Sequence, residues 1–358
     1  MNPTHIHRHA QLLTDYCLDV QPMDRVLIQS NTLALPLVEE IYREVLERGA
    51  VPVLRLEFPD REGCFKHHAS AEVLEHVHAA DLAQEASFSC ILRILAPQAS
   101  QYPFDALKNQ HHNKRTQQLS QVRTSKRWCI TPFPTAQGAE LAGLSLEAFE
   151  MFVAQSMFLD NSNPRAQWEA MGLQQAKLID RLGAARELHI LAPETDLRLK
   201  VTDRTWVNSN GKRNMPSGEV FTGPIENSAT GHIFFDIPTL YQERKVKGVR
   251  LVFEQGRVVS ATADEGEDVL HAALETDVGA RFLGEIGIGT NVGIQQCTQQ
   301  ILFDEKIKGT VHLALGRSYP ETGGCNQSAI HWDLICDLRM GGQILLDGQL
   351  FQDRGQFV

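Results

Sequence analysis

The segment GGCNQSAIHWDLICDLRMGG, Gly323 to Gly342, places a histidine and an aspartate two residues apart in a run that otherwise resembles a buried strand. Successive side chains of a strand point to opposite faces of the sheet. One face of this strand therefore carries only apolar side chains, namely Ile330, Trp332, Leu334, Cys336 and Leu338. The opposite face carries His331 and Asp333. Polar residues on a solvated face need no special explanation, so this pair alone does not predict a functional site.

The composition limits the class of protein. The chain has 358 residues, which is long enough for two domains that each have a core. Its formal net charge of -10 argues against a nucleic-acid partner and against an anionic membrane surface, because both attract basic proteins. No apolar run is long enough to span a membrane, and the polar N-terminal segment lacks the apolar core of a signal peptide.

The seven cysteines are scattered along the chain, and none of them forms a C-x-x-C pair. This spacing is typical neither of a zinc ribbon nor of a disulfide framework. We therefore expect a reducing, cytoplasmic compartment.

The pattern of apolar residues changes along the chain. In the first half, helical stretches alternate with short apolar runs at residues 25–29, 51–56, 88–95 and 127–130, which predicts a parallel sheet covered by helices. A single helix is expected near residues 71–80. Beyond residues 183–188, short alternating strands dominate. We predict an α/β domain over residues 1–185 and a β-rich α+β metal-binding domain over residues 186–358.

Three histidines near the N-terminus, His5, His7 and His9, raise the question of a metal site. His5 and His9 share one face of the expected helix. Because no carboxylate or cysteine accompanies them, a solvated helix face is the preferred interpretation.

Four short segments of the second half each place metal-capable side chains on the minority face of an apolar strand. These side chains are Glu219, Glu285, His312, His331 and Asp333. A carboxylate on such a face is costly unless a partner neutralises it. A salt bridge is the simpler explanation for any one of them. Two histidines and three carboxylates together match the ligands of a site for two divalent metal ions.

The glycines of residues 287–293 follow the spacing G-x-G-x-x-x-G, which differs from the dinucleotide-binding pattern G-x-G-x-x-G. Tight connections between strands explain these glycines better than a nucleotide loop does.

Four motifs of the second half resemble, in order, the thermophilic metalloaminopeptidases of the aminopeptidase T and S type, a leucyl aminopeptidase-like family. The motifs are NMPSGEVFTGP (214–224), RFLGEIGIGTN (281–291), LFDEKIKGTVHLALGRSYPETGG (302–324) and NQSAIHWDLICDLR (326–339). A weaker resemblance extends into the first half, through residues 157–160 and 164–168. The resemblance implies an N-terminal α/β domain, a C-terminal β-rich domain that carries two metals, and a homodimer.

The same resemblance implies roles for individual residues. The implied metal ligands are Glu219, Glu285, His312, His331 and Asp333, and Tyr319 matches the catalytic tyrosine of the family. The expected reaction is removal of N-terminal residues from peptides. Glu219 or Glu285 would carry the proton, and Tyr319 would stabilise the oxyanion. Zinc, cobalt and manganese all suit this mixed nitrogen and oxygen ligand set.

Two alternatives remain open at this point. His312, His331 and Asp333 alone would form the two-histidine, one-carboxylate triad of an Fe(II) oxygenase. Ring-cleaving dioxygenases that act on dihydroxypyridines are similar to this aminopeptidase family, but their chemistry does not require Glu219 and Glu285. The second alternative is a metal-stabilised protein without catalytic activity.

Overall fold

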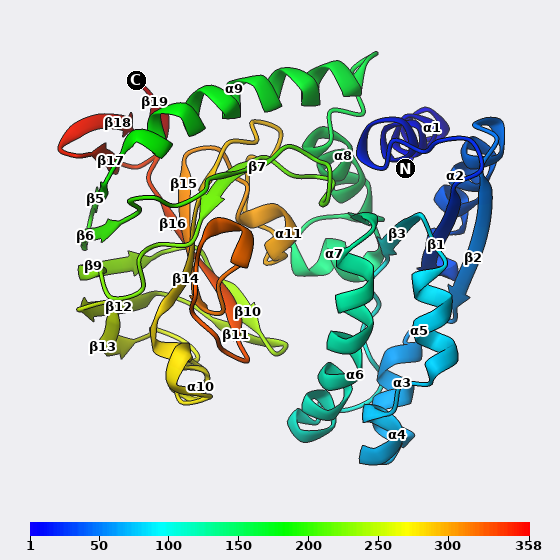
Figure 1. Ribbon diagram of the computed structural model, residues 1–358, viewed down its shortest axis with the longest axis horizontal. Helices are drawn as coiled ribbons and strands as arrows, with labels where there is room; N and C mark the ends of the chain where they lie inside the picture. Colours follow the sequence, from blue (N-terminus) through cyan, green and yellow to red (C-terminus); the bar gives the residue numbers. More distant parts are fainter. The chain divides into compact units, whose positions relative to one another are not determined.

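The computed structural model describes residues 1–358, and the chain forms two compact units (Figure 1). The first unit contains Met1–Gln167 and Gly211–Pro216, and the second contains Trp168–Asn210 and Ser217–Val358. The division into domains 1–185 and 186–358 stays a prediction, because a compact unit is not by itself a domain that folds alone.

The first unit is built on a parallel sheet with the strand order β2-β1-β3-β4. Its strands are β1 (Arg25–Asn31), β2 (Val51–Glu57), β3 (Cys90–Leu95) and β4 (Arg127–Pro132). Helical segments connect successive strands, as parallel pairing requires. The predicted α/β architecture with a parallel sheet is therefore confirmed.

The helical segments of the first unit mostly follow the sequence pattern. They are α1 (Pro3–Gln11), the π-helical turn η1 (Leu12–Cys17), η2 (Thr32–Ala34), α2 (Leu35–Glu47), α3 (Arg61–His68), α4 (Ala71–Glu75), α5 (Ala79–Ala86), α6 (Ala106–Thr124), α7 (Ala136–Leu141) and α8 (Leu146–Ser156). The prediction of a single helix near residues 71–80 is wrong. It is divided into α4 and α5, because His76 and His78 both adopt extended backbone angles.

The N-terminal histidines differ from the expectation of a solvated face. His5 and His9 are both buried, and only His7 of the three is substantially exposed. His9 Nε2 lies 2.7 Å from the hydroxyl of Thr131 on β4. Burial lowers the pKa of His9 to about 3, so this imidazole is neutral in the folded protein. The shared face of α1 packs inward because its neighbours Ala10 and Leu13 belong to the core.

The second unit contains two antiparallel sheets, preceded by the long helix α9 (Pro164–Ala184), most of which belongs to this unit. The eight-stranded sheet has the order β13-β12-β9-β6-β5-β17-β18-β19. Its strands are β5 (Glu187–Ala192), β6 (Thr195–Lys200), β9 (Thr230–Phe235), β12 (Val249–Glu254), β13 (Arg257–Thr262), β17 (Gln343–Leu346), β18 (Gln349–Asp353) and β19 (Gln356–Phe357).

The five-stranded sheet has the order β16-β15-β14-β8-β7 and carries the motifs of the sequence analysis. Its strands are β7 (Val207–Ser209), β8 (Glu219–Thr222), β14 (Leu283–Gly289), β15 (Thr310–Gly316) and β16 (His331–Asp337). The remaining elements are β10 (Thr239–Tyr241), β11 (Arg244–Val246), α10 (Glu267–Leu274), η3 (Val278–Arg281), α11 (Ile301–Asp304) and η4 (Pro320–Thr322). The predicted β-rich second half is confirmed.

One face of the five-stranded sheet packs into the core of the second unit. The apolar residues predicted on one side of β16 are all buried there, with Ile330 the most exposed at 7%. The same core contains apolar residues of the eight-stranded sheet, such as Leu197 and Phe253. Fully burying such a side chain contributes roughly 1.5–3 kcal/mol, so the register of β16 is strongly held. The other face of the sheet is thereby free to carry polar groups.

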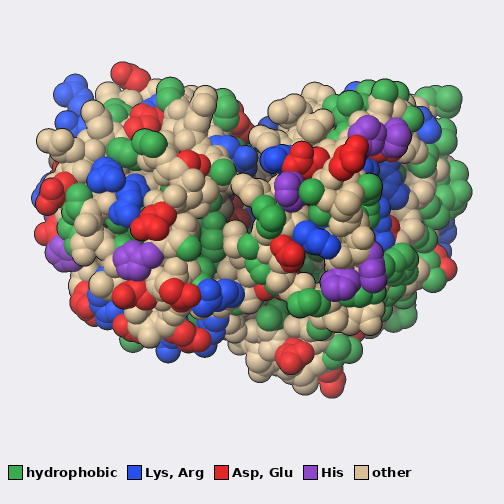
Figure 2. All heavy atoms as spheres, turned by 90° about the horizontal axis from the view of Figure 1, so that it is seen from below, with side chains coloured by type: hydrophobic (Ala, Val, Ile, Leu, Met, Phe, Trp, Pro, Cys, Tyr) green, Lys and Arg blue, Asp and Glu red, His purple; other side chains and the backbone are tan.

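The surface agrees with the charge analysis. On the face drawn in Figure 2, Lys and Arg side chains are interspersed with Asp and Glu side chains, without a large basic field. No helix of the structure combines the length and the apolarity needed to cross a membrane.

Candidate metal centre

The five predicted ligands lie together on the face of the five-stranded sheet that is opposite the apolar core. His312 on β15 is central, with its Nε2 3.2 Å from Glu285 Oε1 and 3.4 Å from Glu219 Oε2. His331 Nε2 lies 3.8 Å from Glu285 Oε2 and 3.6 Å from Asp333 Oδ1. All five side chains are buried or nearly so. Five residues from four strands, which are spread over more than a hundred positions of the sequence, thus lie close together.

The cross-strand register explains why there is room for these side chains. Ala314 of β15 is paired with Glu285 on one side and with Asp333 on the other. The remaining proposed ligands all face glycines across the sheet, in the pairs Glu219 with Gly289, His312 with Gly287, and His331 with Gly316. Directly opposed residues share a face, so small residues here form the floor of the site.

Gly287 shows how tight this floor is. A Cβ atom at this position would lie 2.1 Å from Nε2 of His312 and 2.2 Å from its Cε1. Gly287 and Gly289 lie within strand β14, so the expectation that they mark tight connections between strands is wrong. They provide space for the His312 ring and for the backbone of Ile307, respectively.

A break in the register directs Glu285 into the site. Leu283 pairs with Leu315, whereas Glu285 pairs with Ala314, so the pairing shifts between the two residues. Without the shift, Glu285 would point to the same face as Leu283, into the core. Such irregularities commonly re-aim side chains next to functional sites.

The electrostatics of the cluster call for a cation. Three carboxylate oxygens, Glu219 Oε2, Glu285 Oε2 and Asp333 Oδ1, are buried without a hydrogen-bond partner. Burial lowers the pKa of His312, but the Glu285 and Glu219 carboxylates outweigh it and raise this pKa to about 9. Buried oxygens without partners are costly unless a metal or another cation neutralises them. The ligand atoms of Glu219, Glu285 and His312 all lie within 4.8 Å of one another, so the donor set fits a divalent metal.

The orientation of His331 supports the same interpretation. Its Nδ1 lies 2.7 Å from the backbone carbonyl oxygen of Arg317, to which the ring N–H can donate. The other nitrogen, Nε2, then faces Glu285 and Asp333 with its lone pair. Metal-binding histidines usually donate their second ring nitrogen in this way.

Tyr319 lies beside this cluster and not within it. It precedes η4, and its ring centroid is 5.0 Å from that of His331 and 5.8 Å from that of Phe221. Burial, and then the negative charges of Glu285 and Asp333, raise the pKa of the Tyr319 phenol well above its ordinary value. At neutral pH the hydroxyl therefore keeps its proton and is a hydrogen-bond donor.

Two further charged residues of the site escaped the sequence analysis. Lys306 is fully buried, with its Nζ 3.6 Å from Glu219 Oε1 and in contact with the carboxylate of Glu305. Glu305 also lies close to His312 and Asp333, and the ligand atoms of these three residues are within 4.8 Å of one another. Both residues stand in the run DEKIKG (304–309), and such a cluster of acidic and basic residues is typical of an exposed turn. No local pattern distinguishes a buried lysine from an exposed one.

A second carboxylate and histidine cluster, in the first unit, does not need a metal. His7 Nδ1 lies 2.6 Å from Glu40 Oε1 and 3.7 Å from Glu44 Oε1. Arg43 pairs with Glu40 and Arg48 with Glu44, so both carboxylates already have cationic partners.

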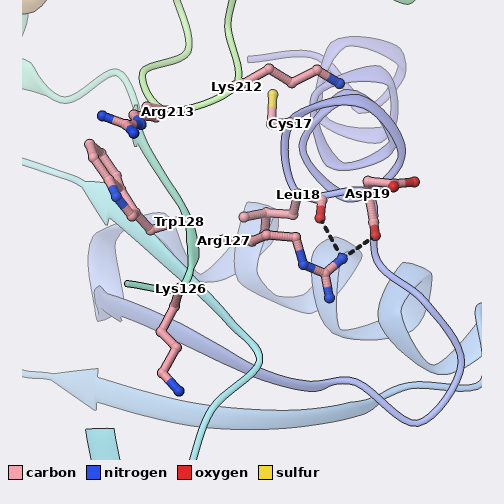
Figure 3. A pocket seen from close by; sticks show the side chains of 8 residues that line it. All are labelled: Cys17, Leu18, Asp19, Lys126, Arg127, Trp128, Lys212 and Arg213. Carbon is pink, nitrogen blue, oxygen red and sulfur yellow. Dashed lines mark hydrogen bonds between the residues drawn. The ribbon is translucent and has the colours of Figure 1, made fainter. Parts of the chain in front are cut away.

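A basic pocket of about 270 Å³ also lies in the first unit (Figure 3). It is lined by Cys17, Leu18, Asp19, Lys126, Arg127, Trp128, Lys212 and Arg213. The Arg127 guanidinium donates to the backbone carbonyl oxygen of Leu18 at 3.0 Å and pairs with Asp24 at 2.5 Å. Lys212 donates to the backbone carbonyl of Tyr16. These cations already have partners, so the pocket is weak evidence for a binding site.

Comparison with known proteins assigns the class. The model of a family described as thermophilic metalloprotease (M29) matches residues 3–352, nearly the whole chain. Together with the buried carboxylates and histidines, this match defines a metal-dependent peptidase. The class of hydrolase predicted from the sequence is thereby confirmed. The chain belongs to the M29 family of thermophilic metalloproteases.

The relatives agree with this assignment. Aminopeptidase 2 of Geobacillus stearothermophilus is 26% identical over 397 aligned positions, which cover 96% of this chain and 95% of the relative. Aminopeptidase AmpS of Bacillus subtilis is 30% identical over 254 positions, 62% of this chain and 60% of the relative. The structure of wild-type AmpT from Thermus thermophilus superposes with a TM-score of 0.85 over 99% of both chains, at 22% identity. That superposition confirms the predicted fold.

Proposed function

We propose that the chain hydrolyses the N-terminal peptide bond of peptides with two divalent metal ions, held by Glu219, Glu285, His312, His331 and Asp333. The observation that carries the proposal is the convergence of these side chains on one sheet face, with three buried carboxylate oxygens lacking partners. Five ligands exceed the three that a single catalytic ion takes from a protein. The aminopeptidase names of the relatives support the N-terminal specificity.

Bound divalent ions would polarise the scissile carbonyl and lower the pKa of a bound water to near neutrality. The protein's own residues supply the rest. Glu219 or Glu285 accepts the proton of the attacking water and returns it to the leaving amine. The Tyr319 hydroxyl donates a hydrogen bond to the oxyanion of the tetrahedral intermediate. The free α-amine of the substrate would bind either a metal ion or an acidic side chain of the site. Zinc, cobalt and manganese are the proposed ions, because each accepts mixed imidazole and carboxylate ligands.

The test combines metal analysis with a substrate panel. The chain is stripped of metal, reloaded with Co²⁺, Zn²⁺ or Mn²⁺, and assayed on aminoacyl-p-nitroanilides and on the same compounds with an acetylated α-amine. We expect two ions per chain and cleavage of the free amines only. A stoichiometry of one ion, or equal cleavage of acetylated substrates, would contradict the proposal.

The Fe(II) dioxygenase alternative is not favoured by the geometry. Glu219 and Glu285 both lie close enough to His312 to be ligands of the same site. A triad of His312, His331 and Asp333 alone would leave these two carboxylates without a role. Oxygen uptake with Fe(II) and a dihydroxypyridine, run beside the peptidase assay, would reveal that activity. A metal-stabilised protein without activity would bind ions and turn over neither substrate.

Two properties of the whole protein are part of the proposal. A reducing cytoplasmic location is supported by the seven cysteines, all of which are free. A homodimer is supported by the apolar edge of the first unit, where hydrophobic side chains gather in Figure 2. The edge strand β2 of this unit exposes Val51, Leu54 and Leu56. An exposed apolar edge strand is a surface on which a second chain can pair. Light scattering coupled to gel filtration measures the oligomeric state directly.

A further inference from the structure

Lys306 is a fully buried cation inside a site that the proposed function assigns to cations. Its side chain is 0% exposed, and it lies between the carboxylates of Glu219 and Glu305. A lysine is almost never fully buried unless it is paired. A positive charge next to a cation site weakens cation binding by repulsion, so its presence there needs a reason.

The backbone around Lys306 is tied to the segment that leads into Glu219. The Asn291 amide donates to the Lys306 carbonyl oxygen at 3.0 Å, and the amide of Thr290 donates to the carbonyl oxygen of Gly218 at 2.8 Å. The side-chain amide of Asn291 donates to the carbonyl oxygen of Ser217 at 2.8 Å. Residues 290–291 therefore bridge the backbone of Lys306 and the turn before Glu219, which holds the backbones that carry the two side chains next to each other.

The two carboxylate oxygens of Glu219 are in different environments. Oε1 lies 3.6 Å from Lys306 Nζ, whereas Oε2 lies 3.4 Å from His312 Nε2 and has no hydrogen-bond partner. The attraction of Lys306 for Oε1 opposes rotation of the carboxylate. Oε2 is consequently the oxygen that Glu219 presents to the other ligands.

We propose that Lys306 is a positioning residue of the metal centre, which holds Glu219 so that one oxygen, Oε2, is presented to the metal. This inference rests on the proposed function. It extends that function to a lysine that lies outside the proposed ligand set.

The two possible roles of Lys306, a counter-ion or a positioning residue, predict opposite changes in the affinity for divalent cations when its charge is removed. If Lys306 acts only through its charge, the neutral variant Lys306→Met binds divalent cations more tightly, because a repulsive charge is gone. If Lys306 positions Glu219, the same variant binds them more weakly. Loss of a residue that orients a metal ligand typically costs about 10–100-fold in affinity.

The experiment is a titration of the metal-free chain with Co²⁺ alone, followed by the visible absorption of the bound ion. The unaltered chain is compared with Lys306→Met and with the control Lys308→Met. Lys308 is half-buried two residues further on, and its replacement removes the same charge outside the cluster. We expect Lys306→Met to bind Co²⁺ about 10–100-fold more weakly with an altered spectrum, and Lys308→Met to match the unaltered chain.

Circular dichroism of the metal-free variants checks folding, and Lys306→Gln, which keeps a polar N–H in the site, decides the question if Lys306→Met does not fold. Co²⁺ affinity equal to or above that of the unaltered chain in the folded variant overturns the proposal, as does misfolding of both variants. If the unaltered chain binds no Co²⁺, the proposed metal centre fails as well. If it binds two ions and cleaves peptides while the Lys306 variants behave identically, only the role of Lys306 fails.

Discussion

Replacement of Gly287 by alanine tests the geometry of the site without removing any proposed ligand. The new Cβ would lie 2.1 Å from Nε2 of the His312 ring, which has to retreat by about 1.3 Å to reach an ordinary contact of 3.4 Å. The ring is fully buried on strand β15 and cannot swing into solvent. Overpacking of this kind costs roughly 1–3 kcal/mol of stability. A catalytic group misplaced by about 1 Å can cost on the order of 10²-fold in rate.

The assay measures kcat/KM on an aminoacyl-p-nitroanilide and the midpoint of urea unfolding of the metal-free chain. We expect Gly287→Ala to lose about 10²-fold in kcat/KM and about 1–3 kcal/mol in the free energy of unfolding. Gly183→Ala is the control. It lies near the end of α9, and apart from its chain neighbours and the backbone of its own helix no atom lies within 4 Å of its new Cβ. There alanine favours the helix by up to about 1 kcal/mol. The reasoning is refuted if Gly287→Ala keeps full activity and stability, because His312 would then not lie against the Gly287 backbone.

Three further predictions concern single residues. Asp333→Asn should lose bound metal and activity together, whereas Asp337→Asn, on the same strand face but paired with an arginine, should keep both; equal losses in metal analysis would indicate a structural face. Tyr319→Phe should keep its metal and its KM while kcat falls roughly 10²–10³-fold, the usual cost of one oxyanion donor, and parent-like turnover would make Tyr319 structural. Burial lowers the pKa of His9 to about 3, below the value of 6.5 of an exposed histidine, so the unfolded chain takes up this proton first as the pH falls. The contribution of His9 is therefore complete above pH ~6.5 and decreases by about 1.4 kcal/mol per pH unit below it. Urea unfolding at pH 7 and 5.5 should show a smaller acid effect in His9→Gln, and an unchanged acid effect would contradict the assignment.

Much of the fold follows from local patterns in the sequence. The two-residue period of a strand determines which side chains of β16 enter the core, because a slip by one residue would expose every apolar one. The same period assigned His312 and the His331 and Asp333 pair to the opposite face. Alternating helices and apolar runs were enough to predict the parallel sheet of the first unit. These predictions succeed because they depend on residues that are near in sequence.

Other features depend on pairing between distant segments, and only the tertiary structure decided them. The approach of Glu219 to His312 requires β8, β14 and β15 to pair in one register, and the register shift after Leu283 is what turns Glu285 towards them. Glycine is needed at position 287 only because the ring of His312, on the neighbouring strand β15, lies against its backbone. Lysine and histidine are residue types that are usually found at the surface. Lys306 and His9 are nevertheless buried, because other elements of the fold cover them. Burial of a charged or polar side chain is favourable only when a distant partner meets it, and that partner is invisible to local pattern.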